Sequence, residues 1–136
     1  MLSRAAFILV AFWAGSLWTI CGIVAPSLFA ILEDRRLAGQ LAGRFFHIET
    51  WIGVGIGGLL LVLSFAGKIT VPRLWVALAA GFPLASYLIL GPLMSQARAA
   101  GDMARFGMLH GVSAVLFLGA CLSVLVLLWK LSRPAG

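Results

Sequence analysis

The sequence predicts an all-α integral membrane protein, a single four-helix bundle formed by residues 1–136. Of its 136 residues, 62% are hydrophobic and only 10% are charged, which is outside the range of soluble domains. The apolar residues fall into four runs, and each run is long enough to cross a hydrocarbon core of about 30 Å. Because backbone polar groups must be satisfied within a segment that crosses lipid, each run is expected to be a helix.

Charged or proline-containing breaks separate the four expected spans, which cover residues 5–30, 45–66, 73–93 and 108–129. Pro26 within the first span predicts a kink. Arg4 precedes this span, as in a signal peptide, but the apolar run continues through Ala30 without a cleavage site of small residues. We therefore expect the first helix to be retained.

The segment EDRRLAGQLAGR connects the first two spans. Leu37, Leu41 and Phe45 follow one another at four-residue spacing, with charged residues on the other side. This pattern predicts a short helix that lies in the membrane interface.

Two stretches of the sequence resemble each other and suggest an internal repeat. GRFFHIE at 43–49 precedes the second span, and ARFGMLHG at 104–111 precedes the fourth. Pro26 and Pro92 also lie in corresponding parts of the first and third spans. Two helical hairpins in the same orientation, related by a pseudo-twofold axis along the membrane normal, would explain these pairs. The hydrophobic pattern common to all helical hairpins is the alternative.

Ionisable residues lie at the expected starts of the second and fourth spans, on the same side of the membrane, and define a candidate polar pocket. Its candidate residues are Arg44, Glu49, Arg105, His110 and Ser113. A lone charge at the bilayer centre costs about 2.5–3.5 kcal/mol, so mutual pairing near the span ends is favourable. In the alternative interpretation, the arginines extend to lipid phosphates and the histidines only mark the interface.

His47 and His110 are the two histidines of the chain. Together they could hold a haem iron, or bind zinc or copper with Glu49 or a sulfur ligand. No closely spaced ligand motif supports a metal site, and bis-histidine haem usually lies deeper inside a bundle. We therefore expect no cofactor, with haem or a transition metal as the alternative.

Glycines occur at spacings that favour close helix packing. Gly53 and Gly57 form a small-xxx-small face, as do Gly107 with Gly111 and Gly15 with Ala11. Such faces allow another helix backbone to approach closely. We expect packing within the bundle, with homo-oligomer contacts as the second possibility. The glycines at 53–58 lack the GK[ST] sequence of a nucleotide-binding loop.

The net charge of +6 does not indicate nucleic acid, because the basic residues lie in short loops and at the termini, where they meet lipid headgroups. Five Lys or Arg residues lie on each side of the membrane, so the positive-inside rule does not decide the topology. All four acidic residues lie on the side away from the termini, which favours cytoplasmic termini.

No serine lies in a nucleophile elbow or a triad, so an enzyme is not the favoured interpretation.

The chain resembles a bacterial family of small four-helix membrane proteins of unknown function, related to the eukaryotic transmembrane protein associated with cisplatin resistance. The residues that carry the resemblance are Gly15, Pro26, Leu28 and Phe29; Ala38, Gly39, Gly43, Arg44 and Phe46; and Arg105, Phe106, Leu109, His110 and Ser113. The resemblance implies a four-helix inner-membrane protein with no established catalytic activity. The link to platinum-drug tolerance suggests export, trafficking or a stress response in the eukaryotic branch, without giving a mechanism.

The sequence thus favours a non-enzymatic multi-pass protein of the bacterial inner membrane. Its polar pocket would bind or move a small solute, an ion or a lipid headgroup in a stress or tolerance role. Membrane lipid and a second copy of the chain are the expected partners. A haem- or metal-binding redox protein, or an assembly partner of another membrane protein, are the alternatives.

Overall fold

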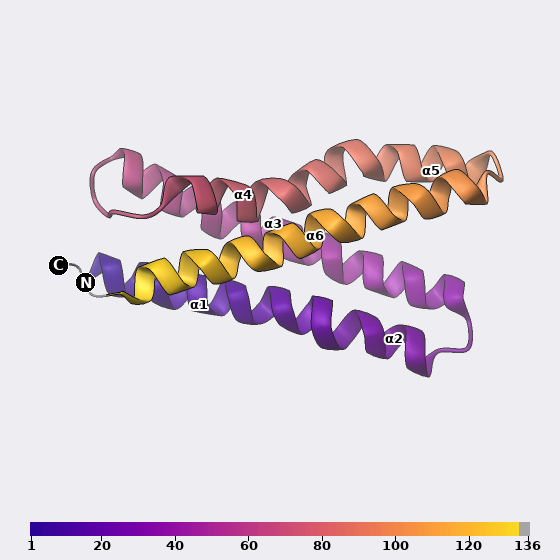
Figure 1. Ribbon diagram of the computed structural model, residues 1–136, viewed down its shortest axis with the longest axis horizontal. Helices are drawn as coiled ribbons and strands as arrows, with labels where there is room; N and C mark the ends of the chain where they lie inside the picture. Colours follow the sequence, from indigo (N-terminus) through magenta and orange to yellow (C-terminus); the bar gives the residue numbers. More distant parts are fainter. Residues whose placement is uncertain (134–136) are drawn as a thin grey trace.

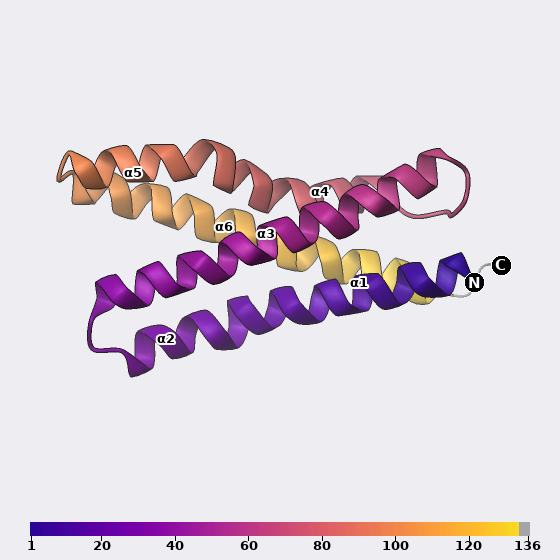
Figure 2. The same ribbon diagram turned by 180° about the vertical axis from the view of Figure 1, so that it is seen from behind.

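The computed structural model describes residues 1–133 and is a bundle of four helical spans (Figure 1). The spans are Leu2–Ile31, Arg35–Phe65, Arg73–Ala99 and Met103–Ser132, and each is long and apolar enough to cross a membrane. The first span begins and the fourth span ends at the same end of the bundle, which we call the terminal end (Figures 1 and 2). The opposite end holds residues 32–34 and 100–102 and is called the acidic end. The expected all-α four-helix bundle is confirmed.

The first and third spans are each divided by a short π-helix. The elements in chain order are α1 (Leu2–Thr19), η1 (Ile20–Val24), α2 (Ala25–Ile31), α3 (Arg35–Phe65), α4 (Arg73–Ala85), η2 (Ser86–Leu90), α5 (Gly91–Ala99) and α6 (Met103–Ser132). The π-helices η1 and η2 both end just before a helix that carries proline in its first turn, Pro26 in α2 and Pro92 in α5. Proline lacks an N–H group, and its ring collides with the carbonyl four residues earlier, so a wider turn at this point relieves both problems.

The shared π-helices and prolines support the predicted repeat, in which the first hairpin corresponds to the second. Both π-helices are five residues long, and each is followed by one small residue and then proline. The next helices, α3 and α6, both begin after a capping aspartate. Asp34 Oδ1 accepts hydrogen bonds from the backbone N–H groups of Arg36 and Leu37 at 2.9 and 3.3 Å, and Asp102 Oδ1 accepts one from the N–H of Arg105 at 3.1 Å. The two hairpins therefore share the order helix, π-turn, proline helix, aspartate cap, helix.

The expected separate helix in the interface is not present, because its residues form the first turns of α3. The cap at Asp34 starts the helix at Arg35, and neither proline nor a left-handed residue interrupts it before the apolar run. The hydropathy of the sequence marks where lipid contact begins, whereas the cap marks where the helix begins. The second span is therefore about ten residues longer at its start than the range 45–66 predicted.

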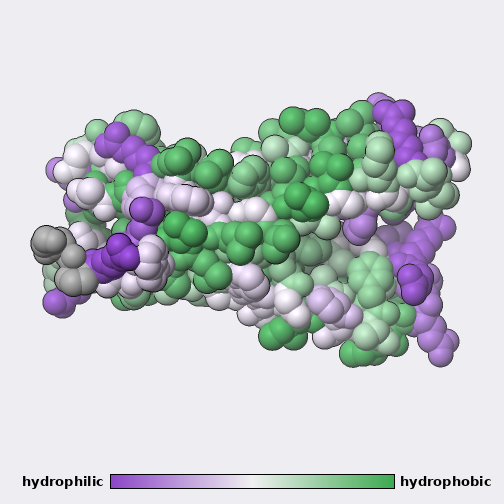
Figure 3. All heavy atoms as spheres, viewed as in Figure 1, coloured by the Kyte–Doolittle hydropathy of each residue, from purple (hydrophilic) through white to green (hydrophobic). Residues whose placement is uncertain are grey.

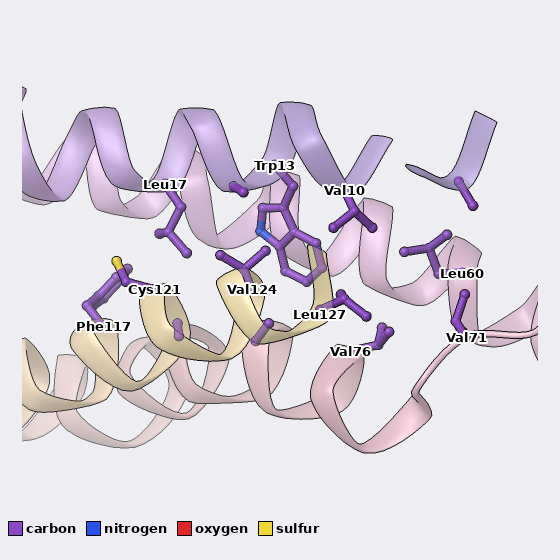
Figure 4. Close-up of a cluster of buried hydrophobic side chains, with 14 of the residues drawn as sticks. Val10, Trp13, Leu17, Leu60, Val71, Val76, Phe117, Cys121, Val124 and Leu127 are labelled. Carbon is purple, nitrogen blue, oxygen red and sulfur yellow. The ribbon is translucent and has the colours of Figure 1, made fainter. Parts of the chain in front are cut away.

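The buried hydrophobic core lies mainly in the half of the bundle toward the terminal end, and Figure 4 shows its side chains in close-up. Trp13 of α1 is 1% exposed and is the largest fully buried side chain. Around it the four spans contribute Val10, Leu17, Leu60, Val76, Val124 and Leu127, all fully buried. Hydrophobic side chains also cover the middle of the outer surface, and hydrophilic ones gather at both ends (Figure 3), as expected of a protein that faces lipid between two aqueous phases.

Candidate functional site

A cavity of about 460 Å³ lies between the two hairpins in the half of the bundle toward the acidic end. The ribbon views show why it forms there, since the α2–α3 pair and the α5–α6 pair diverge toward this end (Figures 1 and 2). Residues of α2, α3, α4, η2, α5 and α6 line it. Several of these side chains, such as His47 and His110, are also exposed, so the cavity is open to the outside.

Aromatic and apolar side chains form most of the cavity wall. The large ones are Phe29, Phe46, Pro83, Met94, Phe106 and Phe117. The rings of Phe46 on α3 and Phe117 on α6 are 4.5 Å apart between centroids, and Phe117 also belongs to the main core. This pair therefore separates the cavity from the packed half of the bundle.

Polar groups stand at intervals on this apolar wall. Ser86 of η2 and Ser113 of α6 share a hydrogen bond of 2.6 Å between their hydroxyl groups, which links the third and fourth spans. The ring of His47 meets Tyr87 edge to face, with centroids 4.5 Å apart. The guanidinium of Arg98 lies 4.7 Å from the centroid of the Phe106 ring, a cation–π contact that holds the charge beside the cavity.

The α6 residues that line the cavity recur every three or four positions along the helix. Phe106, His110, Ser113 and Phe117 recur at intervals of three or four, so they share one face of the helix. His110 lies nearly parallel to Phe106, with an interplanar angle of 13°. On α3 the same spacing brings Gly43, Phe46, His47 and Thr50 to the cavity. Neither pattern stands out in the sequence, because apolar residues also occupy the other faces.

The structure brings together only part of the predicted pocket. His110 and Ser113 line the cavity, together with His47. Arg44, Glu49 and Arg105 do not line it: Arg44 borders a neighbouring open depression that shares His47 with the cavity, and Glu49 is buried against α1. Arg105 is exposed in the first turn of α6.

The two Arg-Phe motifs differ in depth because their helices begin at different distances before them. Arg44 lies ten residues after the cap Asp34, whereas Arg105 lies three residues after the cap Asp102. The difference is two helical turns, or about 10 Å along the helix axis. The sequence likeness between 43–49 and 104–111 is thus out of register with the structural repeat.

Arg98 is a cavity residue that the sequence did not predict. It follows the expected third span, 73–93, and therefore looks like a loop residue. In the structure α5 continues to Ala99, which places Arg98 in its last turn, where a cation interacts favourably with the helix carbonyl end. The four-residue interval from Met94 to Arg98, both on the cavity wall, is the pattern that could have revealed it.

The predicted packing glycines fall into two groups. A Cβ atom added at Gly53 would lie 3.1 Å from Trp13 Nε1, and one added at Gly57 would lie 2.9 Å from Ala80 Cβ. These two positions leave room for neighbouring helices. At Gly15, Gly107 and Gly111 an added Cβ would meet nothing within 4 Å.

The predicted metal ligands share the cavity without forming a larger ligand cluster. Within residues 1–133, His, Cys, Asp and Glu side chains do not gather in any group of three suited to a metal ion. The two imidazoles of His47 and His110 on the wall of one cavity are the available ligand pair. A structural tetrahedral ion needs three or four protein ligands, more than this pair supplies.

Four apolar spans define a multi-pass membrane protein, with a cavity between its two hairpins. More specifically, the chain belongs to the family described as a domain of unknown function, DUF4149, whose model matches residues 8–103. The match covers most of the first span and all of the second and third, and it reaches the start of α6. Comparisons with curated proteins and with solved structures find no match. The resemblance to an uncharacterised family of membrane proteins is thereby confirmed.

Proposed function

We propose that this protein binds a small amphiphile with an anionic headgroup, such as a lipid, in the cavity between its hairpins and has no enzymatic activity. The observation that carries the proposal is the composition of the wall. Phe46 and Phe117 are apolar at the side that adjoins the core, whereas Arg98 belongs to the last turn before the acidic end. An acyl chain fits the first environment and a phosphate or carboxylate fits the second.

The hydrogen-bonding groups support an oriented ligand. His47, Tyr87, His110 and the hydroxyl pair of Ser86 and Ser113 offer donors and acceptors along one cavity. A few convergent polar groups on an apolar wall are typical of small-molecule sites. The ligand would enter with its headgroup remaining at the membrane surface.

Replacing Arg98 with glutamine should weaken binding of lysophosphatidylglycerol about 10-fold to 100-fold, because a hydrogen bond to a charged group contributes about 1.5–3 kcal/mol. The measurement is titration of the purified protein in neutral-lipid nanodiscs, followed by native mass spectrometry. Arg105→Gln is the matched control. It removes the same charge at the same end, but from a residue that does not line the cavity, and should leave binding unchanged.

Equal losses in the two variants would show that only the overall charge of the acidic end matters, and no loss in either would refute a role for Arg98. Lysophosphatidylcholine serves as the zwitterionic probe and should bind more weakly than the anionic lipid. Inorganic phosphate tests whether the headgroup alone is sufficient for binding. If phosphate binds as tightly as the lysolipid, the ligand is a free anion.

A haem- or metal-binding redox protein is the second candidate, and the observation that favours it is that His47 and His110 line one cavity. Purified protein should then show a Soret absorption band, and His110→Ala should abolish or shift this band. A colourless, metal-free preparation that cannot be reconstituted with haemin excludes this candidate.

The proposed setting is the bacterial inner membrane, with both termini in the cytoplasm and the cavity facing the other side. The proposal includes a role in stress tolerance, in line with the suggested relation to the cisplatin-resistance protein. It also includes homo-oligomers, or assembly with another membrane protein, through Gly15 and through Gly107 with Gly111. The open space around an added Cβ at these three positions supports such contacts. Crosslinking in membranes, followed by mass spectrometry, tests both the orientation and the oligomer.

A further inference from the structure

Glu49 lies near the middle of the second span and is buried inside the bundle. It is preceded by 14 residues of α3 and followed by 16, and its side chain is 1% exposed. Glu49 is therefore at the middle of a 31-residue helix, about 23 Å from either helix end. An ionisable residue at this depth indicates a functional site, with its partner to be identified from the contacts.

The only hydrogen-bond partner of this carboxyl group among the described residues is a serine hydroxyl. Ser16 Oγ of α1 is 2.9 Å from Glu49 Oε1, and Glu49 Oε2 is buried without a hydrogen-bond partner. The other titratable groups that face it are the thiols of Cys21 in η1 and Cys121 in α6, which also neighbour each other. No lysine, arginine or histidine of the described chain pairs with it.

The hydroxyl of Ser16 has one proton and two acceptors within reach. Besides Glu49 Oε1, the backbone carbonyl oxygen of Trp13 lies 3.0 Å from Ser16 Oγ. If the carboxyl group is neutral, it donates its own proton to Ser16 Oγ, and the hydroxyl donates to the carbonyl, so both bonds form at once. If the carboxyl group is ionised, one of the two bonds is lost and an uncompensated charge remains buried, which is costly in a medium of low dielectric constant.

We propose that Glu49 and Ser16 form a proton-binding site in the interior of the bundle. Binding forms one O–H bond: the carboxylate takes a proton from hydronium, giving a carboxylic acid and water. A proton fits this site better than a metal cation does. Calcium takes six to eight oxygen ligands, whereas the site offers two carboxyl oxygens, one hydroxyl and the carbonyl oxygen of Trp13.

The proton site is separate from the proposed ligand cavity but adjoins it along the chain. Glu49 does not line the cavity, whereas the next residue, Thr50, does. Thr50 Oγ1 donates a hydrogen bond to the carbonyl of Phe46 at 2.8 Å, so it turns toward its own helix and not toward Glu49. Because the carboxyl group is packed against α1, exchange of its proton with water requires α1 and α3 to separate locally.

Infrared spectroscopy of the full chain in nanodiscs tests the site directly. At neutral pH the wild type should show the carbonyl stretching band of a protonated carboxylic acid, and Glu49→Gln should lose it completely. Glu33→Gln is the matched control, because Glu33 is an exposed acid at the acidic end, and it should retain the band. Ser16→Ala should keep the band and shift its frequency, since the hydrogen-bond partner of the carboxyl group is lost.

Absence of the band from the wild type, or its persistence in Glu49→Gln, overturns the proposal. Glutamine has nearly the shape of a neutral glutamic acid, so this variant is expected to fold with unchanged thermal stability. A large loss of stability in Glu49→Gln would instead indicate an ionised carboxylate with an essential role. Glu49→Asp gives an independent check, because it retains a carboxyl group and should retain the band at a shifted frequency.

Discussion

Replacing Trp13 with alanine should lower the free energy of unfolding by about 3 kcal/mol. The indole is fully buried between α1 and α3, and the packed atoms around it cannot fill the space that it leaves. In a membrane, the transfer of apolar surface from water contributes little, because the separated helices are already in lipid. The cost is therefore mainly the lost packing, at about 24 cal/mol per Å³ of residual cavity.

Trp129 provides the matched control for this prediction. It is 57% exposed near the end of α6, where Arg133 stacks on its ring at 3.7 Å. Trp129→Ala should change the free energy of unfolding by no more than about 0.5 kcal/mol, as for other surface substitutions. Both variants are compared by SDS denaturation in mixed micelles, with near-ultraviolet circular dichroism as the readout. Equal effects would show that Trp13 is not a packing centre.

The four spans could be predicted from composition and length alone, because a bilayer leaves a chain few choices. The faces of the helices were harder to predict. The small faces at Gly53 and Gly57 are visible in the sequence, but their partner Trp13 is not. A tryptophan in an apolar run could equally face lipid, the core or the interface. Only the packing of α1 on α3 shows that Trp13 faces the core, where it lies against Gly53 and Gly57.

Helix faces decide which predicted pocket residues reach the cavity, since Glu49 contacts Ser16 of α1 whereas His47 on the same helix lines the cavity. The depth of Glu49 along its helix, by contrast, depends on where the helix starts. The apolar run begins at Phe45, so Glu49 seemed to stand at the membrane surface beside Arg44. The helix begins ten residues earlier, and Glu49 then lies at its middle. The aspartate cap at Asp34, in a charged loop, sets the start of this helix. A hydropathy profile does not detect such a cap. At the other hairpin the expected span ended too early: α5 continues to Ala99, which makes Arg98 a helical residue.

The π-helices connect the repeat to the cavity. Ser86 and Tyr87 of η2 line the cavity, and Ala25, which directly follows η1, also lines it. Each wider turn therefore lies where its hairpin leaves the packed core and begins to diverge. Single π-turns within α-helices are often found at functional sites. The cavity thus follows from the proline and π-turn that both hairpins share, and not from the Arg-Phe motifs.

Replacing Gly57 with alanine should destabilise the bundle by about 1–3 kcal/mol. The added methyl group would lie 2.9 Å from Ala80 Cβ and 3.4 Å from Trp13 Cη2, whereas carbon atoms in contact prefer about 3.5–4.0 Å. The Cβ of Ala80 is fixed to its backbone and cannot rotate away. Helices α3 and α4 would therefore have to move apart along their interface.

Gly58→Ala separates this clash from the intrinsic effect of alanine in a helix. Gly58 is the next residue of the same helix, and an added Cβ there would meet nothing within 4 Å. The difference in unfolding free energy between the two variants, measured by SDS denaturation, thus isolates the packing cost. Adding Ala80→Gly to Gly57→Ala removes the closest neighbour and should recover most of the loss, because contacting residues couple. A double variant no more stable than Gly57→Ala would show that contact with Trp13, not the α3–α4 interface, limits this position.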